Sequence, residues 1–316
     1  MKTYAAYSLN TKLRMDSSSG AIFSHLAMGV IDKGGVVYGV AMSDDFYAAV
    51  FKRVTEKNEI KYLRGSKYLQ ANVGNTFINV KRDLENGMQV LFSGTICQIN
   101  GLKSYLQKEY LNLILVDVIC HGTSSPKLWR KYIQNKEKKI GKINDLNFRC
   151  KNIGWKNFGI KENNKYIPKE IDAYMQMFLR DYSLRPSCYE CNAKKKKSSD
   201  ISLGDFWGIE NISKAMDDDR GCSLVIVRTD KGNNLFNEIK NNICSKEVTY
   251  KEGVENNPAE YKSPKKPKER ETLLSDMNNI TFDKLQKKYI KPSLKYFIRT
   301  KLRVIKRYAL INIMGK

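Results

Sequence analysis

Two short apolar segments, each followed by a helical pattern, constrain the fold of this chain more than any other feature. Residues 89–95 and 111–120 are apolar and strand-like, and residues 97–108 and 126–141 have the composition of helices, the second with proline in its first turn. This β-α-β-α order predicts two parallel strands, because a crossover helix returns the chain to the same side of the sheet. We therefore predict an α/β fold, a mixed sheet with helices on its faces.

Four of the seven cysteines stand where a loop begins or pauses. Cys97 and Cys120 follow the two predicted strands, and Cys188 and Cys191 form a C-x₂-C pair in RPSCYEC. Because parallel strands end at the same edge of a sheet, we expect Cys97 and Cys120 to be neighbours in space. In the cytoplasm thiols stay reduced, so these cysteines are expected to be metal ligands or small buried residues rather than disulfides. The pattern predicts a metal centre in a loop region.

The cysteine pattern leaves the kind of metal centre open. One close pair and two solitary cysteines fit a [4Fe–4S] cluster, whereas structural zinc usually has a second close pair, and unligated thiols are the third alternative. With only His25 and His121 in the chain, any metal site depends on sulfur. The remaining cysteines are predicted to be small buried residues: Cys150, Cys222 and Cys244.

Two turns contain the groups that hold phosphates in proteins. The first comprises Ser17, Ser18, Ser19 and Gly20, ahead of a predicted helix whose N–H groups are free. The second comprises Arg64, Gly65, Ser66 and Lys67. A helix cap and a surface turn have the same composition, and neither segment matches the G-x-G-x-x-G fingerprint. Asp205, beside aromatic residues at a strand end, either orients a ligand or forms a turn. The sequence thus indicates a nucleotide cofactor without identifying it.

Positive charge is concentrated near the end of the chain. The net charge is +23, and residues 262–316 contain 16 Lys/Arg and 4 Asp/Glu, which gives +12. Between Leu294 and Met314, apolar residues gather on one side of a helix and Lys/Arg on the other, at about 100° per residue. Such a helix is typical of contact with an anionic membrane surface; docking on the protein's own core or on a partner is the alternative.

The sequence also bears on location. It has no signal peptide and no run of about 18 apolar residues, so we expect a cytoplasmic protein, peripheral on the inner membrane if the basic helix binds lipid. No base-reading or stacking module matches, so a nucleic-acid partner is not expected.

The motifs taken together resemble the coenzyme F420 hydrogenase/dehydrogenase beta subunit family. The resemblance runs from about Tyr4 to about Thr229 through SSSGAIF, GGVVYG, LRGSKY, VLFSGTICQINGLKSYL, VDVICHGTSSPKLWRKY, FRCKNIGWK, RPSCYEC and DISLGDFWG. Ala21 and Ile96 stand where the family pattern has Gly and Pro, and Thr123 and Ser124 replace Val-Pro.

The resemblance implies an oxidoreductase that passes electrons between a [4Fe–4S] cluster and FAD, to or from a soluble substrate. It implies that Cys97, Cys120, Cys188 and Cys191 bind one cluster. It favours FAD near the two phosphate-type turns and a third loop, formed by Ser93, Gly94 and Thr95. No catalytic residue follows from it.

Partners and context are also implied by the resemblance. Many members have a ferredoxin-like module that this sequence lacks, so we expect a ferredoxin or another electron-donor protein. Relatives in bacterial polysaccharide gene clusters imply a role in polysaccharide biosynthesis; the alternative is a non-catalytic, metal-stabilised accessory protein of a membrane-associated polysaccharide assembly system. We expect a flavin and iron–sulfur domain at 1–255 and a basic linker with an amphipathic helical tail at 256–316.

Overall fold

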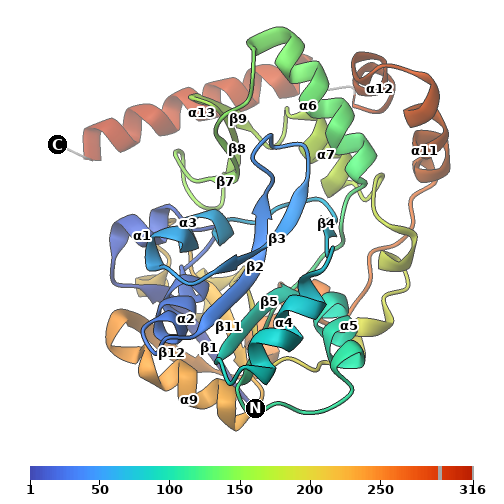
Figure 1. The fold of residues 1–316 in the computed structure, drawn as a ribbon. Coiled ribbons are helices and arrows are strands. Elements are labelled where there is room, and N and C mark those ends of the chain that lie inside the picture. Colours follow the sequence, from blue (N-terminus) through green and yellow to red (C-terminus); the bar gives the residue numbers. More distant parts are fainter. Residues whose placement is uncertain (291–293, 315–316) are drawn as a thin grey trace.

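The computed structural model describes residues 1–290 and 294–314, which form two sheets and the helices around them (Figure 1). The large sheet has the strand order β12 (Ile243–Val248), β1 (Lys2–Ser8), β11 (Ser223–Val227), β10 (Ile201–Asp205), β6 (Leu113–Val118), β5 (Val90–Thr95), β2 (Val36–Met42), β3 (Ala49–Val54) and β4 (Ala71–Asn72). The small antiparallel sheet consists of β7 (Leu146–Cys150), β8 (Gly159–Glu162) and β9 (Lys165–Pro168).

The predicted parallel pair is confirmed at the centre of the large sheet. Strands β5 and β6 run parallel, with Thr95 opposite Val118, and β2 and β10 extend the parallel block on either side. Helix α5 (Ile96–Leu106) follows β5 at once, because the Thr95 N–H donates to Gln98 Oε1 at 2.9 Å and so caps the first turn. Helix α6 (Pro126–Ile140) begins at its proline and ends before Gly141.

The parallel strands are buried on both faces. Along β5, Val90 and Phe92 pack towards α4 (Thr76–Glu85) and α5, whereas Leu91 packs towards α2 (Ile22–Ile31) and α9 (Asp230–Glu238). Successive side chains of a strand point to opposite faces, so these nearly continuous apolar segments fit a sheet with helices on both sides. The mixed α/β architecture predicted from the sequence is therefore confirmed.

A second core joins the small sheet to the helices in the upper part of Figure 1. It is centred on Trp129 and Tyr174, from α6 and α7 (Ala173–Leu179). Helices α11 (Glu269–Asn279) and α12 (Phe282–Tyr289), within the predicted basic tail, contribute buried apolar side chains: Leu273, Met277, Phe282 and Leu285. The division of the chain after residue 255 stays a prediction.

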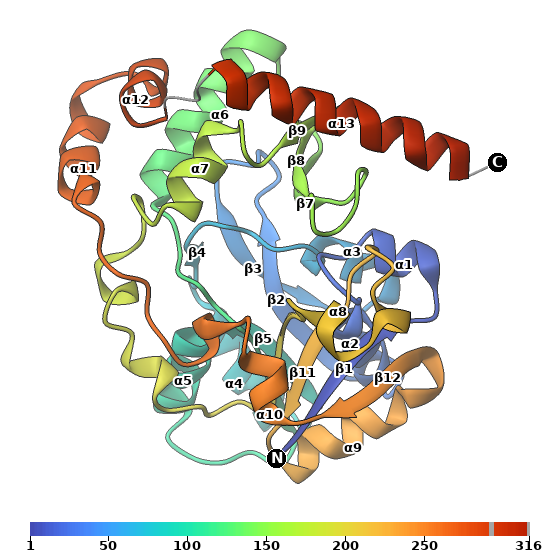
Figure 2. The ribbon, with the colours of Figure 1, turned by 180° about the vertical axis from the view of Figure 1, so that it is seen from behind.

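The last helix, α13 (Leu294–Met314), extends across the outer side of the small sheet (Figure 2). The short helices are α1 (Thr11–Met15), α3 (Ile60–Leu63), α8 (Ile209–Ile212) and α10 (Tyr250–Val254). Within residues 1–290 and 294–314, none of the helices combines the length and the apolar character that a membrane span requires.

The turn before α2 contains a residue in a left-handed conformation. Ala21 has φ 68° and ψ 18°, a region that costs a residue with a Cβ about 1–2 kcal/mol and glycine nothing. The motif resemblance leads us to expect glycine at this position. The backbone geometry gives a physical reason for that glycine.

We therefore expect Ala21→Gly to stabilise the protein by up to about 1 kcal/mol, because it relieves the left-handed backbone. The matched control is Ala27→Gly, in the middle of the same helix, which should destabilise it by about 1 kcal/mol or more. Urea unfolding measures both changes. A loss of stability in Ala21→Gly as large as that in Ala27→Gly would contradict this account.

Candidate functional site

The carboxyl ends of the parallel strands border a cavity of about 650 Å³, a size usual for cofactor and substrate sites. The large-sheet side supplies the turn before α2, residues 63–69, the start of α5 and residues 118–123. The small-sheet side supplies Arg149, Lys156, Phe158 and Lys169. The cavity therefore lies between the two sheets, at the edge that the β5–β6 pairing predicts.

Nearly all of the predicted cofactor-binding residues line this one cavity: Ser17, Ser18, Ser19, Arg64, Gly65, Ser66, Lys67, Ser93, Gly94 and Thr95. Gly20 does not, because it packs behind the turn, where a Cβ would lie 2.3 Å from the Ala6 carbonyl oxygen. The two phosphate-type turns touch directly: the Ser66 N–H donates to Ser18 Oγ at 2.7 Å.

The second turn supplies two basic side chains, Arg64 and Lys67, and the Asp16 carboxylate attracts the first of them. Arg64 is half-buried, its Nε has no hydrogen-bond partner among the described residues, and burial lowers its pKa. Lys67 donates to the carbonyl oxygens of Tyr62 and Arg64, at 3.1 and 2.7 Å, and burial lowers its pKa to about 7. Since an anion would provide the missing partner, this wall suits a phosphate group.

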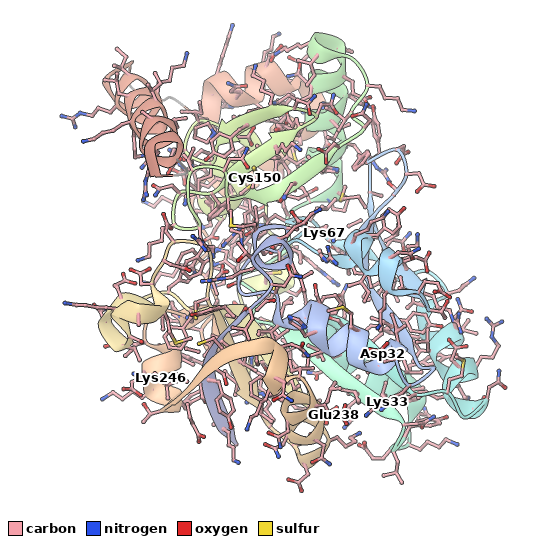
Figure 3. All side chains as sticks on the ribbon, turned by 90° about the vertical axis from the view of Figure 1, so that its left-hand side faces the viewer. Asp32, Lys33, Lys67, Cys150, Glu238 and Lys246 are labelled. Atoms are coloured by element: carbon pink, nitrogen blue, oxygen red, sulfur yellow. The ribbon has the colours of Figure 1, made fainter. Side chains whose placement is uncertain are left out.

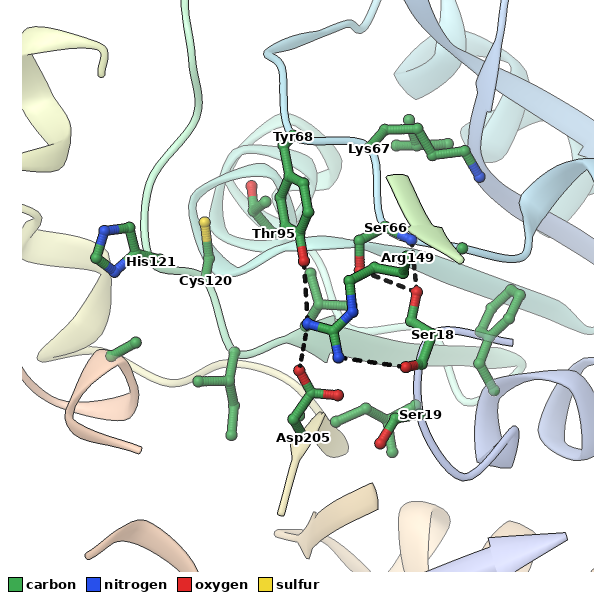
Figure 4. Close-up of a pocket in the computed structure, with 18 of the residues that line it drawn as sticks. Ser18, Ser19, Ser66, Lys67, Tyr68, Thr95, Cys120, His121, Arg149 and Asp205 are labelled. Atoms are coloured by element: carbon green, nitrogen blue, oxygen red, sulfur yellow. Dashed lines mark hydrogen bonds and ion pairs between the residues drawn. The ribbon is translucent and has the colours of Figure 1, made fainter. Parts of the chain in front are cut away.

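Arg149 is a cavity residue that the sequence does not identify. It is 4% exposed, forms an ion pair with Asp205 at 2.9 Å, and donates to the Tyr68 hydroxyl at 3.2 Å and the Ser18 carbonyl at 3.4 Å (Figure 4). Its guanidinium stacks 3.8 Å from the centre of the Phe158 ring. Its Nε has no hydrogen-bond partner in the described part of the chain. Arg149 thus presents a fixed cation with one free donor at the cavity wall.

Lys151 holds the first turn against its neighbours. The buried ammonium donates to the carbonyl oxygens of Arg14, Ser19 and Arg220, the last two at 3.1 and 2.7 Å. Burial, with smaller contributions from the positive charges of Arg14 and Arg149, lowers the pKa of Lys151 to about 7. The position of the serine turn therefore depends on a lysine that releases its proton more easily than usual.

The four predicted ligand cysteines gather around Cys120. Cys97 is the second residue of α5, Cys188 ends a short 3₁₀ turn, Cys191 precedes another, and Cys120 lines the cavity itself. Burial, with smaller contributions from the thiols of Cys188, Cys97 and Cys191, raises the pKa of the Cys120 thiol to about 12, so all three lie within electrostatic range of it. Lys194 opposes this rise.

Close approach of two loops brings Cys188 to Cys120. A Cβ on Gly122 would lie 2.7 Å from the Leu184 side chain and 3.4 Å from the Cys188 Cβ, so only glycine fits there without displacement. Nearby, His121 pairs with Asp181. Cys150 and Cys222 are buried, which confirms their predicted role, while Cys244 is half-buried in β12.

The donor set is made of thiols, and its geometry can be compared with the two kinds of metal centre that the sequence leaves open. No group of three or more His, Cys, Asp or Glu side chains is arranged to hold one metal ion within the residues that the structure describes. A tetrahedral zinc site requires its thiolates about 2.3 Å from a single centre. A [4Fe–4S] cluster takes one thiolate on each of four irons, and Cys97, Cys120, Cys188 and Cys191 match that donor number.

The fold and family of the chain follow from comparison with known proteins. Fourteen chains of solved structures match, among them one from the F420-reducing [NiFe] hydrogenase complex of Methanosarcina barkeri. It is 16% identical, with a TM-score of 0.55, and the match covers 78% of this chain and 81% of that chain. At this identity the likeness shows a shared α/β fold. None of the curated protein sequences matches.

The family model for the C terminus of the coenzyme F420 hydrogenase/dehydrogenase beta subunit matches residues 87–252, just over half of the chain. The chain belongs to this family, which confirms the resemblance seen in its motifs. The family consists of oxidoreductase subunits, so membership supports a redox role for this protein at that level.

The Lys151 pKa predicts a pH dependence of stability. Between about pH 7 and the ordinary lysine value of 10.5 the unfolded chain holds the proton and the folded chain does not, so stability rises with pH. From about pH 7 to about pH 9, the wild type should gain about 1–3 kcal/mol of unfolding free energy relative to Lys151→Met. Denaturant titration at both pH values measures this.

The control is Lys142→Met at an exposed position, which should differ from the wild type by the same amount at both pH values. If the difference between wild type and Lys151→Met is also constant with pH, Lys151 does not titrate in this range.

Proposed function

We propose that this protein is a flavin-containing iron–sulfur oxidoreductase that transfers electrons to or from a soluble substrate. Cys97, Cys120, Cys188 and Cys191 would hold a [4Fe–4S] cluster, and the cavity would hold FAD. When bound, the cluster exchanges single electrons and FAD exchanges two, as hydride or as separate electrons.

One observation supports this proposal above the others: Cys120 lines the same cavity as both phosphate-type turns. A group bound by the four cysteines would therefore border whatever occupies the cavity. Redox proteins need such adjacency, because electrons must pass from one centre to the other, whereas a structural metal does not. Family membership adds independent support at the level of oxidoreductase subunits.

The chain's own residues have defined tasks in this proposal. Ser18, Ser66 and Arg64 would bind the phosphates of FAD through a hydroxyl, a backbone turn and a guanidinium whose Nε has no hydrogen-bond partner among the described residues. Arg149, fixed by Asp205, would supply a permanent positive charge to an electron-rich group. The Phe158 and Trp207 rings would exclude water from the cavity wall.

The proposal extends to partners and context. A ferredoxin or another electron-donor protein would supply electrons in the cytoplasm. The similar chain belongs to a hydrogenase complex, which supports the proposal that this protein also binds a protein partner. A role in polysaccharide biosynthesis, and contact with an anionic membrane surface through the C-terminal helix, belong to the same proposal. The polysaccharide context depends on the motif resemblance alone.

Iron content of two cysteine variants tests the ligand assignment. Wild-type protein purified without oxygen should contain about four irons per chain, and Cys188→Ser should lose most of them and become less stable, because a serine hydroxyl binds iron poorly. Cys244→Ser, a free cysteine in β12, is the matched control and should keep both the iron and the stability. Equal iron content in both variants would contradict the assignment of Cys188 as a cluster ligand.

A further inference from the structure

Helix α13 faces the protein with its polar side. The Arg303 guanidinium lies 2.8 Å from Glu170 Oε1, and that of Arg307 lies 3.0 Å from Asp219 Oδ2. Thr300, one turn before Arg303, is buried. These residues recur at the spacing of one helix face, so α13 is held on the protein by ion pairs.

The opposite side of α13 is apolar and exposed. Ile298, Leu302 and Ile305 are 48%, 60% and 64% exposed, and with exposed Ala309 they fall within about 60° of one another around the helix axis. In Figure 3 the helix lies at the upper left, at the edge of the molecule, with side chains extending away from it. An amphipathic helix normally packs its apolar side inward, so this orientation is inverted.

Positive charge flanks the apolar row on both sides. Exposed Arg299 and Lys306 lie on one side and exposed Lys301 on the other, at about 100° per residue. From Leu294 to Met314 the sequence has six Lys/Arg and no Asp/Glu. An apolar row between cations matches the boundary between acyl chains and negatively charged headgroups.

We propose that the outer face of α13 binds the surface of an anionic phospholipid bilayer, with the helix lying in the plane of the headgroups. This deepens the proposed function and rests on it for the identity of the nearby site. Glu170 follows cavity-lining Lys169, and Asp219 accepts the backbone N–H of cavity-lining Lys156 at 2.8 Å. The helix is thus fastened to the small-sheet wall, and bilayer binding holds the cavity beside the membrane, within reach of substrates carried on its surface.

Vesicle co-sedimentation of the full-length holoprotein tests this surface. Vesicles with phosphatidylglycerol should bind the wild type, with binding that weakens as salt increases, and vesicles of phosphatidylcholine alone should bind at least tenfold less. Leu302→Glu should weaken binding to the anionic vesicles at least tenfold, and Ile305→Gln should weaken it without adding charge. The matched control is Leu111→Glu, at a loop position that is 93% exposed, which should bind like the wild type.

The proposal is overturned if the wild type does not bind the anionic vesicles, or if Leu302→Glu binds them as well as the wild type. A lipid-free dimer that Leu302→Glu dissociates, without vesicle binding by the wild type, would instead assign the face to a second copy of the chain. Iron and flavin measured in the same samples separate the two proposals. If the wild type retains both cofactors but does not bind vesicles, the membrane proposal for α13 fails and the oxidoreductase proposal stands. If it binds vesicles but contains neither cofactor, the oxidoreductase proposal fails and the membrane proposal stands.

Discussion

The parallel pairing of β5 and β6 is the constraint on which the rest of the site depends. With Thr95 opposite Val118, both strands end at the same edge, so Thr95 at the end of β5 and Cys120 just after β6 line one cavity. Strand β2 lies beside β5 in the same direction, and the helix before it, α2, begins at the serine turn. A slip in this register would exchange the β5 side chains between the two faces of the sheet and move Thr95 away from Cys120.

Much of this arrangement is predictable, because it follows from local signals and one topological rule. Apolar segments of strand length define β5 and β6, and a proline in the first turn with a glycine just after the last defines α6. Parallel strands end at the same edge of a sheet, and this rule predicts from the amino-acid sequence alone that Cys97 and Cys120 are neighbours. The structure adds that the backbone of residue 21 is left-handed, a conformation that favours glycine.

The opposite wall of the cavity is not predictable in the same way. Arg149 and Asp205 meet only because two sheets pack together, and β8 and β9 are four residues each, too short for a clear periodicity. The buried role of α11 and α12 is hidden by charged composition. The inverted orientation of α13 depends on ion pairs with Glu170 and Asp219, which lie far away in the sequence. Ion pairs between residues far apart in the chain leave no local pattern in the sequence from which the orientation of the helix could be predicted.

The central claim is that one cavity holds a flavin bordered by an iron–sulfur cluster, and an absorption spectrum with metal analysis of protein purified without oxygen tests it most directly. The account predicts flavin bands, with FAD released on denaturation, together with about four irons and four acid-labile sulfides per chain. One zinc per chain without flavin would contradict it, and would indicate a structural metal in a non-catalytic accessory protein.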